Sequence, residues 1–318
     1  MDHPTSTVPI ESESDIERNQ PSAEARMGER VPLPGPNDDV RPAMALSPEG
    51  QRYFQGDTLP VTSSVLISNS KYLNNPYYRE AFATQALRRH GPDLPPTYMV
   101  PIMFKAVDEV VDYKRIEYLL AEEKKKYPEF GEWIDRRKFI HYERDDMAKY
   151  APGTLGAEIY DFLGIPGMDM NLGSGPQSAQ TDMEFFKIGR SQGPRHDIEH
   201  MVTGFGPNTA GENAISMVNV LCQSRFFTPE LATYMNMGLV FITATGYSRT
   251  AHHYQHALPT YLDAMHQGIE MGLAFKKPIF MIDWDHYLDW QLDDIAADLG
   301  IKRGPGKDWD WTTEAATG

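Results

Sequence analysis

The residues most capable of chemistry lie in one short stretch that holds two histidines and a carboxylate. His196 and His200 are one helical turn apart in sequence, and Asp197 precedes His200 by three residues. If residues 196 to 203 form a helix, both imidazoles lie on one face and the carboxylate lies on its neighbouring edge. Neutral imidazole and carboxylate are ligands that Zn²⁺, Fe²⁺, Mn²⁺ and Co²⁺ accept. The stretch therefore predicts a site for a divalent metal.

A further ligand can come from Glu212, which follows a break rich in glycine. In a continuous helix, Glu212 would lie about 18 Å beyond the histidines, at about 1.5 Å per residue. Gly204, Gly206 and Pro207 instead end the first helix, and a second helix can begin near Thr209. The chain can then double back and bring Glu212 to the histidines. Alternatively, Thr209 and Glu212 form a capping box, in which the glutamate only secures the start of the helix.

A second metal pattern overlaps the first. His196, Glu199 and His200 have the spacing H-x-x-E-H of the inverted zinc proteases. In that pattern Glu199 would activate water, and Asp197 would take no part. The spacing of the residues by itself leaves a metallohydrolase open as an alternative.

The longer spacing, H-D-x-x-H followed by eleven residues and then E, resembles the metal motif of the coenzyme Q biosynthesis protein 4 family. Four residues match that motif: His196, Asp197, His200 and Glu212. The segments 152–156 and 268–301 are also similar to that family, and the likeness covers about residues 145–301. Because the N-terminal third departs from the family, the chain resembles a divergent bacterial-type member.

This resemblance implies that the same four residues act as metal ligands and as catalytic residues. It implies a divalent metal cofactor, with zinc as the first choice and iron, manganese or cobalt as alternatives. The implied reaction is oxidative decarboxylation at ring carbon 1 of a polyprenylated hydroxybenzoate-type ring in ubiquinone formation. The other quinone-pathway proteins are implied partners, which the chain would help to organise.

Three further residues are candidates for binding this substrate. Arg195 can pair with an aryl carboxylate, or it can form an ordinary surface ion pair. The resemblance places His252 and His256 near the substrate pocket, and these two histidines could also hold a second metal. The apolar helices expected over residues 214–243 could border a groove for the isoprenoid tail. A non-catalytic scaffold that binds prenyl lipid and carries a structural metal is the alternative.

The composition excludes some classes of partner. A net charge of -15 over 318 residues argues against nucleic acid, whose phosphates such a surface would repel. The single cysteine, Cys222, cannot form an internal disulfide and points to a reducing compartment. No apolar run approaches the roughly 20 residues that cross a bilayer. We therefore expect a bacterial cytoplasmic protein, peripherally associated with the inner membrane through basic patches at 124–126 and 136–138, with a homodimer as an open alternative to a monomer.

The hydrophobic pattern predicts an all-α protein, a compact multi-helix bundle with buried central helices. The runs 214–221 and 231–243 are apolar on most sides, as buried helices are. Amphipathic helices expected at 101–121, 155–163 and 278–299 would wrap this central pair. We expect one helical domain over residues 46–301, after a disordered acidic, proline-rich tail (1–45) and before a polar C-terminal tail (302–318).

Overall fold

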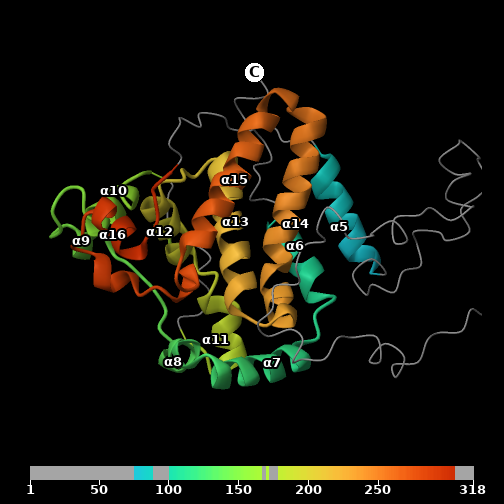
Figure 1. Ribbon diagram of the computed structural model, residues 1–318, viewed down its shortest axis with the longest axis horizontal. Helices are drawn as coiled ribbons and strands as arrows, with labels where there is room; N and C mark the ends of the chain where they lie inside the picture. Colours follow the sequence, from blue (N-terminus) through green and yellow to red (C-terminus); the bar gives the residue numbers. More distant parts are fainter. Residues whose placement is uncertain (1–74, 89–99, 167–169, 172–177, 305–318) are drawn as a thin grey trace, which may run out of the picture. The chain divides into compact units, whose positions relative to one another are not determined.

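The computed structural model describes residues 75–88, 100–166, 170–171 and 178–304, and Figure 1 shows their arrangement. The chain divides into two units, Met1–Ser64 and Val65–Gly318, and every described residue belongs to the second. Within the described ranges, all regular elements are helices, which confirms the all-α prediction. The predicted tail over 1–45, the domain boundary near residue 46 and nearly all of the predicted tail over 302–318 lie outside the described residues.

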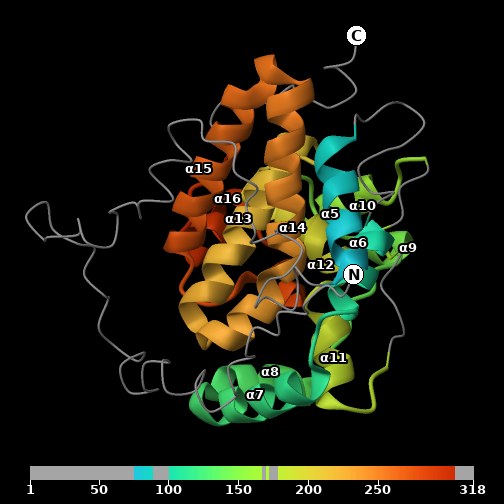
Figure 2. The same ribbon diagram turned by 90° about the vertical axis from the view of Figure 1, so that its right-hand side faces the viewer.

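Three long helices form the centre of the second unit: α13 (Thr209–Phe226), α14 (Pro229–His253) and α15 (Leu258–Ala274). They lie side by side in Figures 1 and 2, and α13 packs against both of the others. Buried side chains occur on most sides of α13 and α14, which confirms the predicted central pair. None of the helices in the described part of the chain combines the length and the apolar character needed to cross a membrane.

Two glycines allow α15 to approach α13 closely. A Cβ atom on Gly268 would lie 2.3 Å from the main-chain oxygen of Ala214 and 2.9 Å from its Cα. One turn later, a Cβ on Gly272 would lie 2.8 Å from the Cβ of Leu221. No side chain can occupy either position without moving the backbone of the neighbouring helix. The pair therefore sets the distance between the helix that begins at Thr209 and its neighbour.

The helices α5 (Pro76–Leu87) and α6 (Val100–Asp108) pack on α14, as Figure 2 shows. Asn75 caps the start of α5, because its side chain accepts a hydrogen bond of 2.9 Å from the Tyr78 amide. The rings of Tyr78 and Phe82 meet the ring of Phe241 edge-on, with centroids 5.5 and 5.2 Å apart. These aromatic contacts hold α5 on the central helices.

The helix predicted over residues 101–121 is wrong, because the chain breaks it between α6 and α7 (Tyr113–Lys126). Asp112 accepts a hydrogen bond of 3.1 Å from the amide of Arg115 and so starts a new helix. An apolar repeat can continue across such a break, since Val110 remains buried between the two helices. Periodicity alone does not reveal a cap of this kind.

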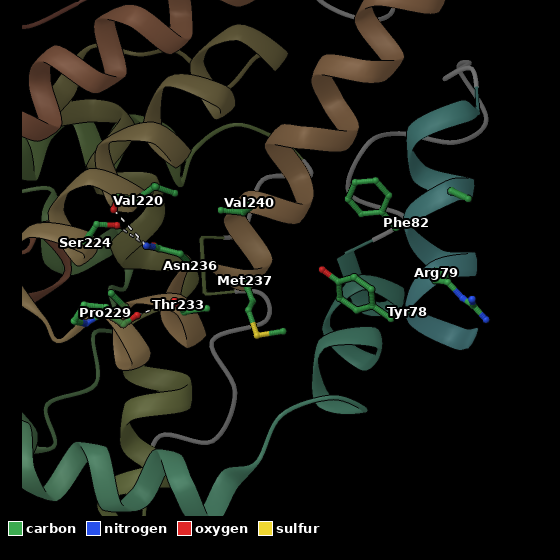
Figure 3. A pocket seen from close by; sticks show the side chains of 12 residues that line it. Tyr78, Arg79, Phe82, Val220, Ser224, Pro229, Thr233, Asn236, Met237 and Val240 are labelled. Carbon is green, nitrogen blue, oxygen red and sulfur yellow. Dashed lines mark hydrogen bonds between the residues drawn. The ribbon is translucent and has the colours of Figure 1, made fainter. Parts of the chain in front are cut away.

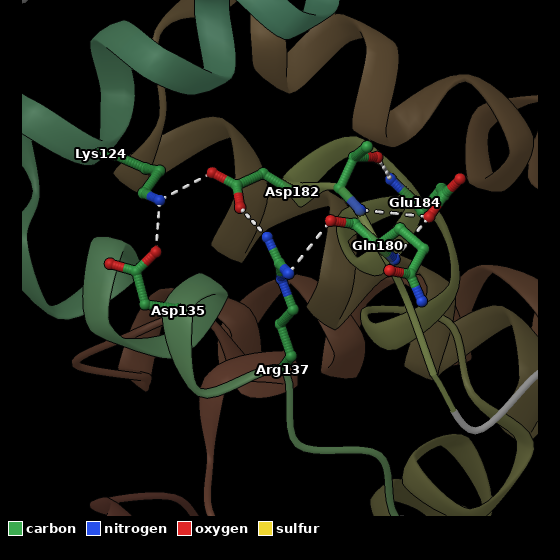
Figure 4. A network of polar contacts seen from close by, with 7 residues as sticks. Lys124, Asp135, Arg137, Gln180, Asp182 and Glu184 are labelled. Carbon is green, nitrogen blue, oxygen red and sulfur yellow. Dashed lines mark hydrogen bonds and ion pairs between the residues drawn. The ribbon is translucent and has the colours of Figure 1, made fainter.

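The helices α7, α8 (Pro128–Arg136) and α11 (Asp182–Gly189) are joined by the polar network of Figure 4. Lys124 contacts Asp135 at 2.5 Å and Asp182 at 2.7 Å, and Arg137 contacts the other oxygen of Asp182 at 2.8 Å. Lys138 also forms an ion pair, with Asp283. Because these cations already have carboxylate partners, the two basic patches carry less free charge than their sequence suggests. Peripheral membrane contact stays a prediction.

The helix predicted over residues 278–299 is also wrong. It is divided into η4 (Ile279–Met281), η5 (Trp284–Tyr287) and α16 (Leu292–Leu299). The main-chain oxygens of Leu288 and Trp290 accept hydrogen bonds of 2.8 and 3.0 Å from Gly156 and Leu155 at the start of α10 (Leu155–Phe162). These carbonyls satisfy the free amides of another helix instead of continuing their own. The short helix α9 (Arg144–Met147) precedes α10.

The close contact at Gly268 gives a stability prediction. We expect Gly268→Ala to lower the free energy of unfolding by about 2 kcal/mol, since the new methyl group would meet backbone atoms of α13. Gly238→Ala in α14 is the matched control, because its Cβ would meet only the end of the Met103 side chain, at 3.6 Å. That change should stabilise the protein by about 0.5 kcal/mol through helix propensity. Urea denaturation measures both, and equal effects of the two substitutions would contradict the described helix contact.

Candidate metal centre

A short hinge between two helices forms the candidate site. The helix α12 (Gly193–Thr203) ends at Gly204, whose φ of 79° lies in the left-handed region and whose amide donates to the His200 oxygen. The next helix, α13, begins at Thr209 after the N-cap Asn208, whose side chain accepts from the Gly211 amide at 2.9 Å. The hinge predicted from the glycines is therefore present, and it turns the chain back towards α12.

The capping-box alternative for Glu212 is wrong. The N-cap is Asn208 rather than Thr209, so Glu212 does not stand at the third helical position, which a capping box requires. Its carboxylate lies instead between the two histidines. Glu212 Oε2 is 3.2 Å from His196 Nε2, and Glu212 Oε1 is 3.3 Å from His200 Nε2. The hinge thus brings the distant glutamate to the histidines.

Three of the four predicted ligands form one compact group. One ligand atom each from His196, His200 and Glu212 lies within 4.8 Å of the others. Two imidazoles and a glutamate are a known ligand set of catalytic zinc sites, in which the remaining positions are left for water or substrate. The side chains of His196 and Glu212 are 43% and 46% exposed, whereas that of His200 is 7% exposed. The group therefore faces solvent on the His196 side.

The orientation of His200 fits a metal ligand. Its Nδ1 lies 2.7 Å from the main-chain oxygen of Phe205, which places the ring proton on Nδ1 in the neutral form. Its Nε2 is buried without a hydrogen-bond partner and is turned towards Glu212. Proteins commonly orient a metal-binding imidazole through a hydrogen bond from the ring nitrogen that does not bind the metal. The residues present therefore fit a divalent cation.

Asp197, the fourth predicted ligand, lies outside this compact group, and its role as a ligand remains a prediction. Its Oδ1 lies 3.5 Å from His196 Nδ1, on the opposite side of the ring from Glu212. Because the Asp197 carboxylate lies at Nδ1 of His196 and Glu212 lies at Nε2, Asp197 stays outside the compact group. It can orient the His196 ring, as outer carboxylates do at metal sites. Its catalytic role remains a prediction.

The charges in this group support one another. Burial by itself would lower the pKa of His196, but hydrogen bonds to Asp197 and Glu212 outweigh burial and raise this pKa well above the ordinary value. Burial would raise the pKa of Glu212, yet the two histidines hold it well below the ordinary value. Glu212 is therefore ionised near neutral pH and presents a negative charge between the two rings. That charge attracts a cation.

Glu199, the central residue of the metallohydrolase pattern, lies in the interior. It is 3% exposed, and its Oε2 accepts a hydrogen bond of 2.8 Å from Asn219 Nδ2 on α13. Burial raises the pKa of Glu199. A base that activates water must reach solvent beside the metal, and Glu199 is packed between α12 and α13 instead. Its placement disfavours the metallohydrolase alternative.

The remaining predicted substrate contacts have different surroundings. Arg195 is 2% exposed and donates to the main-chain oxygens of Gly189 and Ile282 at 3.0 and 3.1 Å. Burial lowers the pKa of Arg195 to about 10. Arg195 thus belongs to the interior and not to a surface ion pair. Its two hydrogen bonds tie α12 to the neighbouring segments, and its contact with a substrate carboxylate remains a prediction.

His252 and His256 are both exposed and do not share a helix. The helix α14 ends at His253, and His256 belongs to the separate turn η3 (Gln255–Ala257). Within the described residues, neither histidine is part of a group of three or more metal-ligating side chains. The second metal site is therefore not supported, because the helical spacing on which it rested is interrupted. Substrate contact by these histidines remains a prediction.

A separate pocket of about 720 Å³ lies where α5 faces the central helices (Figure 3). Its walls are mostly apolar and include Phe82, Val220 and Met237. At one side, Asn236 Nδ2 donates to Ser224 Oγ at 3.0 Å, while Asn236 Oδ1 is buried without a hydrogen-bond partner. The pocket therefore combines an apolar lining with one unused acceptor, as sites for small apolar ligands do.

Several supporting residues could not be found from the sequence. Phe205 acts through its main-chain oxygen, which has no side-chain signature, and Asn219 reaches Glu199 from another helix. Asn208 did have a signal, since asparagine before a helix is a preferred cap and two glycines precede it. Asn236 meets its partner Ser224 only because α13 and α14 pack together, so this contact has no signal in the sequence either.

Comparison with known proteins gives a structural likeness and no sequence match. No protein-family model matches the chain, and no curated protein matches it. A solved structure of a provisionally assigned ubiquinone biosynthesis protein from Nostoc punctiforme PCC 73102 is similar, with a TM-score of 0.52 and 19% sequence identity. The match covers 73% of this chain and 98% of the other. At this identity the likeness shows a shared helical fold.

The different positions of Glu212 and Asp197 give a prediction about metal binding. We expect Glu212→Gln to weaken Co²⁺ binding by more than the roughly 10- to 100-fold that outer partners of metal ligands contribute. Asp197→Ala should weaken binding by only about tenfold, because it removes a contact to the far side of His196. Titration of the metal-free protein with Co²⁺, followed by visible absorption, measures both. Equal loss in the two variants would make Asp197 a ligand after all.

Proposed function

We propose that this chain is a metal-dependent enzyme of ubiquinone biosynthesis that acts on a polyprenylated hydroxybenzoate-type ring. The observation that carries the proposal is the group of His196, His200 and Glu212, whose atoms lie within 4.8 Å of one another on one face open to solvent. The fold shared with the Nostoc protein and the resemblance of the H-D-x-x-H-x₁₁-E spacing to the coenzyme Q biosynthesis protein 4 family support the same pathway.

The proposed reaction replaces the ring carboxyl group with a hydroxyl group. The bond between ring carbon 1 and the carboxyl carbon breaks, carbon dioxide leaves, and the ring carbon gains one oxygen atom from dioxygen. The second oxygen atom leaves as water and takes up two electrons and two protons from an external donor. A divalent ion held by His196, His200 and Glu212 would supply Lewis acidity to the substrate oxygens.

The protein residues would orient the substrate and maintain the charge of the site. The Phe205 oxygen holds the proton of His200 on Nδ1, so that Nε2 is available to the ion. Asp197 would likewise hold a proton on Nδ1 of His196, so that Nε2 of that ring is available to the ion. The partly exposed edge formed by His196 and Glu212 is where a ring carboxylate and phenol could enter, since His200 is closed off by packing.

We also propose that the pocket between α5, α13 and α14 accepts the apolar tail of the substrate. Its lining is mostly apolar, and its α13 residues Val220 and Ser224 follow Glu212 by two and three helical turns. The tail pocket and the metal centre would thus be about 12 to 18 Å apart along α13. A chain of several isoprenoid units can span such a distance, whereas a single ring cannot.

Turnover of a labelled substrate tests the proposed reaction. The metal-loaded full-length protein would be incubated with a prenylated hydroxybenzoate that carries ¹³C in its carboxyl group, together with dioxygen and a reductant. We expect release of ¹³CO₂ and a hydroxylated ring, and we expect at least about 100-fold less of both with His200→Ala, since one ligand of the ion is lost.

The same assay separates the proposed enzyme from the scaffold alternative. Tight binding of the prenylated compound without ¹³CO₂ release, unchanged in His200→Ala, would favour a lipid-binding scaffold with a structural metal. The metal-loaded Glu199→Gln variant is the control for hydrolytic chemistry. If it keeps full decarboxylation, Glu199 has no part in the reaction.

The tail pocket gives a second test within the proposed function. Ala83→Trp places a large side chain from α5 into the pocket and should raise KM for a long-tailed substrate about tenfold, through lost apolar contact. It should leave kcat for a substrate without a tail unchanged. Thr84→Trp is the matched control, because Thr84 is an exposed neighbour on the same helix outside the pocket lining. The same KM in both variants would place the tail elsewhere.

A further inference from the structure

The segment that follows α16 reaches back to α12, the helix that carries His196 and His200. Gly300 ends α16 with a φ of 73°, and residues 301–304, here called the C-terminal strap, run to the end of α12. Arg303 Nε donates to the Val202 oxygen at 3.1 Å, and its Nη2 donates to the Met201 oxygen at 3.0 Å. The Gly304 amide donates to the Thr203 oxygen at 2.8 Å. The strap thus binds three successive main-chain oxygens at the C-terminal end of α12.

Those carbonyls are the ones that a helix leaves without internal partners. The last turn of any helix has free main-chain oxygens and the negative end of the helix dipole. An arginine there satisfies the oxygens and complements the dipole at the same time. Arg303 therefore acts on α12 as a cap supplied by a segment about 100 residues further along the chain.

The strap also touches the hinge itself. A Cβ on Gly204 would lie 2.2 Å from the Gly304 oxygen, and a Cβ on Gly304 would lie 2.3 Å from the Phe205 ring. Both glycines are required for the two chain segments to cross. The strap therefore lies directly on the two residues that follow α12.

From the hinge, a short series of hydrogen bonds leads to the metal ligand. The Thr203 hydroxyl donates to the main-chain oxygen of Glu199 at 2.6 Å and accepts a hydrogen bond from the Phe205 amide at 3.3 Å. The Phe205 oxygen lies 2.7 Å from His200 Nδ1. The position of the Phe205 carbonyl, and with it the orientation of the His200 ring, depends on how the end of α12 is held.

The remaining contact of Arg303 is of a different kind. Its Nη1 donates to Asp293 Oδ1 at 3.0 Å, but the Asp293 side chain is 88% exposed. Exposed ion pairs contribute little to stability, because water and salt screen them. The contacts to the main-chain oxygens of α12 are the ones that can carry a role.

We propose that Arg303 is a positioning residue for the metal centre, which fixes the end of α12 and the hinge so that His200 faces Glu212. This inference rests on the proposed metal site and adds a residue about 100 positions away in the sequence, which neither metal motif contains. Partners that orient metal ligands typically change metal affinity about 10- to 100-fold when they are removed.

Cobalt binding to the full-length protein tests this role, with the metal alone as the probe. We expect Arg303→Ala to weaken Co²⁺ binding about tenfold and to alter the visible absorption bands of the bound ion, since His200 would no longer be held in place. Arg303→Lys should recover part of the affinity, because a lysine can still donate to one of the carbonyls. Asp293→Asn is the matched control and should bind Co²⁺ within about twofold of the unaltered protein.

The outcomes distinguish this inference from the proposed function. If the unaltered protein binds Co²⁺ and Arg303→Ala binds it equally, with the same spectrum, the positioning role is overturned while the metal site stands. Equal losses in Arg303→Ala and Asp293→Asn would attribute the effect to the exposed ion pair and would also overturn the role.

Hydrogen exchange of the metal-free protein gives an independent measurement. If the unaltered protein binds no Co²⁺, the metal site fails, and exchange then decides whether the strap holds the hinge. We expect Arg303→Ala to speed exchange of the Gly204 and Phe205 amides while the amides of α14 keep their protection. Unchanged exchange at the hinge overturns the role of Arg303. Faster exchange throughout α14 as well would indicate general destabilisation and would overturn it too.

Discussion

The contact on which this site depends is the carboxylate of Glu212 placed between two imidazoles. Each of its oxygens faces a different ring, at 3.2 Å from His196 and 3.3 Å from His200. Charged groups this close together are costly to hold, even half-buried, unless they compensate one another. The opposite pKa shifts of His196 and Glu212 reflect that compensation. A divalent cation suits the same place, because it is attracted by the carboxylate and accepted by both nitrogens.

The surrounding packing makes this contact possible. α13 is held at a close distance from α15 by Gly268 and Gly272, so the start of α13 has little freedom to move away from the core. Beneath the site, Glu199 and Asn219 form a buried hydrogen bond between α12 and α13. His196, His200 and Glu212 thus lie where α12 and α13 meet, and the Glu199–Asn219 hydrogen bond joins the same two helices. Rigid elements of this kind hold ligands more accurately than mobile loops do.

The two recognisable features of the protein lie on different parts of one helix. The N-terminal end of α13 carries Glu212 and faces α12, whereas its C-terminal half lines the apolar pocket with α5 and α14. A substrate with a polar ring and a long apolar tail needs both kinds of surface. The scaffold alternative would use only the pocket, and the metallohydrolase would require the buried Glu199 to face solvent. The proposed chemistry on a prenylated aromatic ring would use both.

The sequence by itself determined the all-α class and the central pair of helices, and it predicted that His196, His200 and Glu212 come together. It could do so because His196 and His200 are local neighbours in a helix, and because Gly204 and Gly206 mark the turn that returns Glu212. Only the tertiary structure decided that Asp197 lies on the opposite side of the His196 ring from Glu212, that Glu199 is buried and that residues 278–299 are interrupted. These outcomes depend on partners far away in the chain, such as Asn219 and the amides of α10. A spacing along the chain contains no information about which distant group will satisfy a given donor or acceptor.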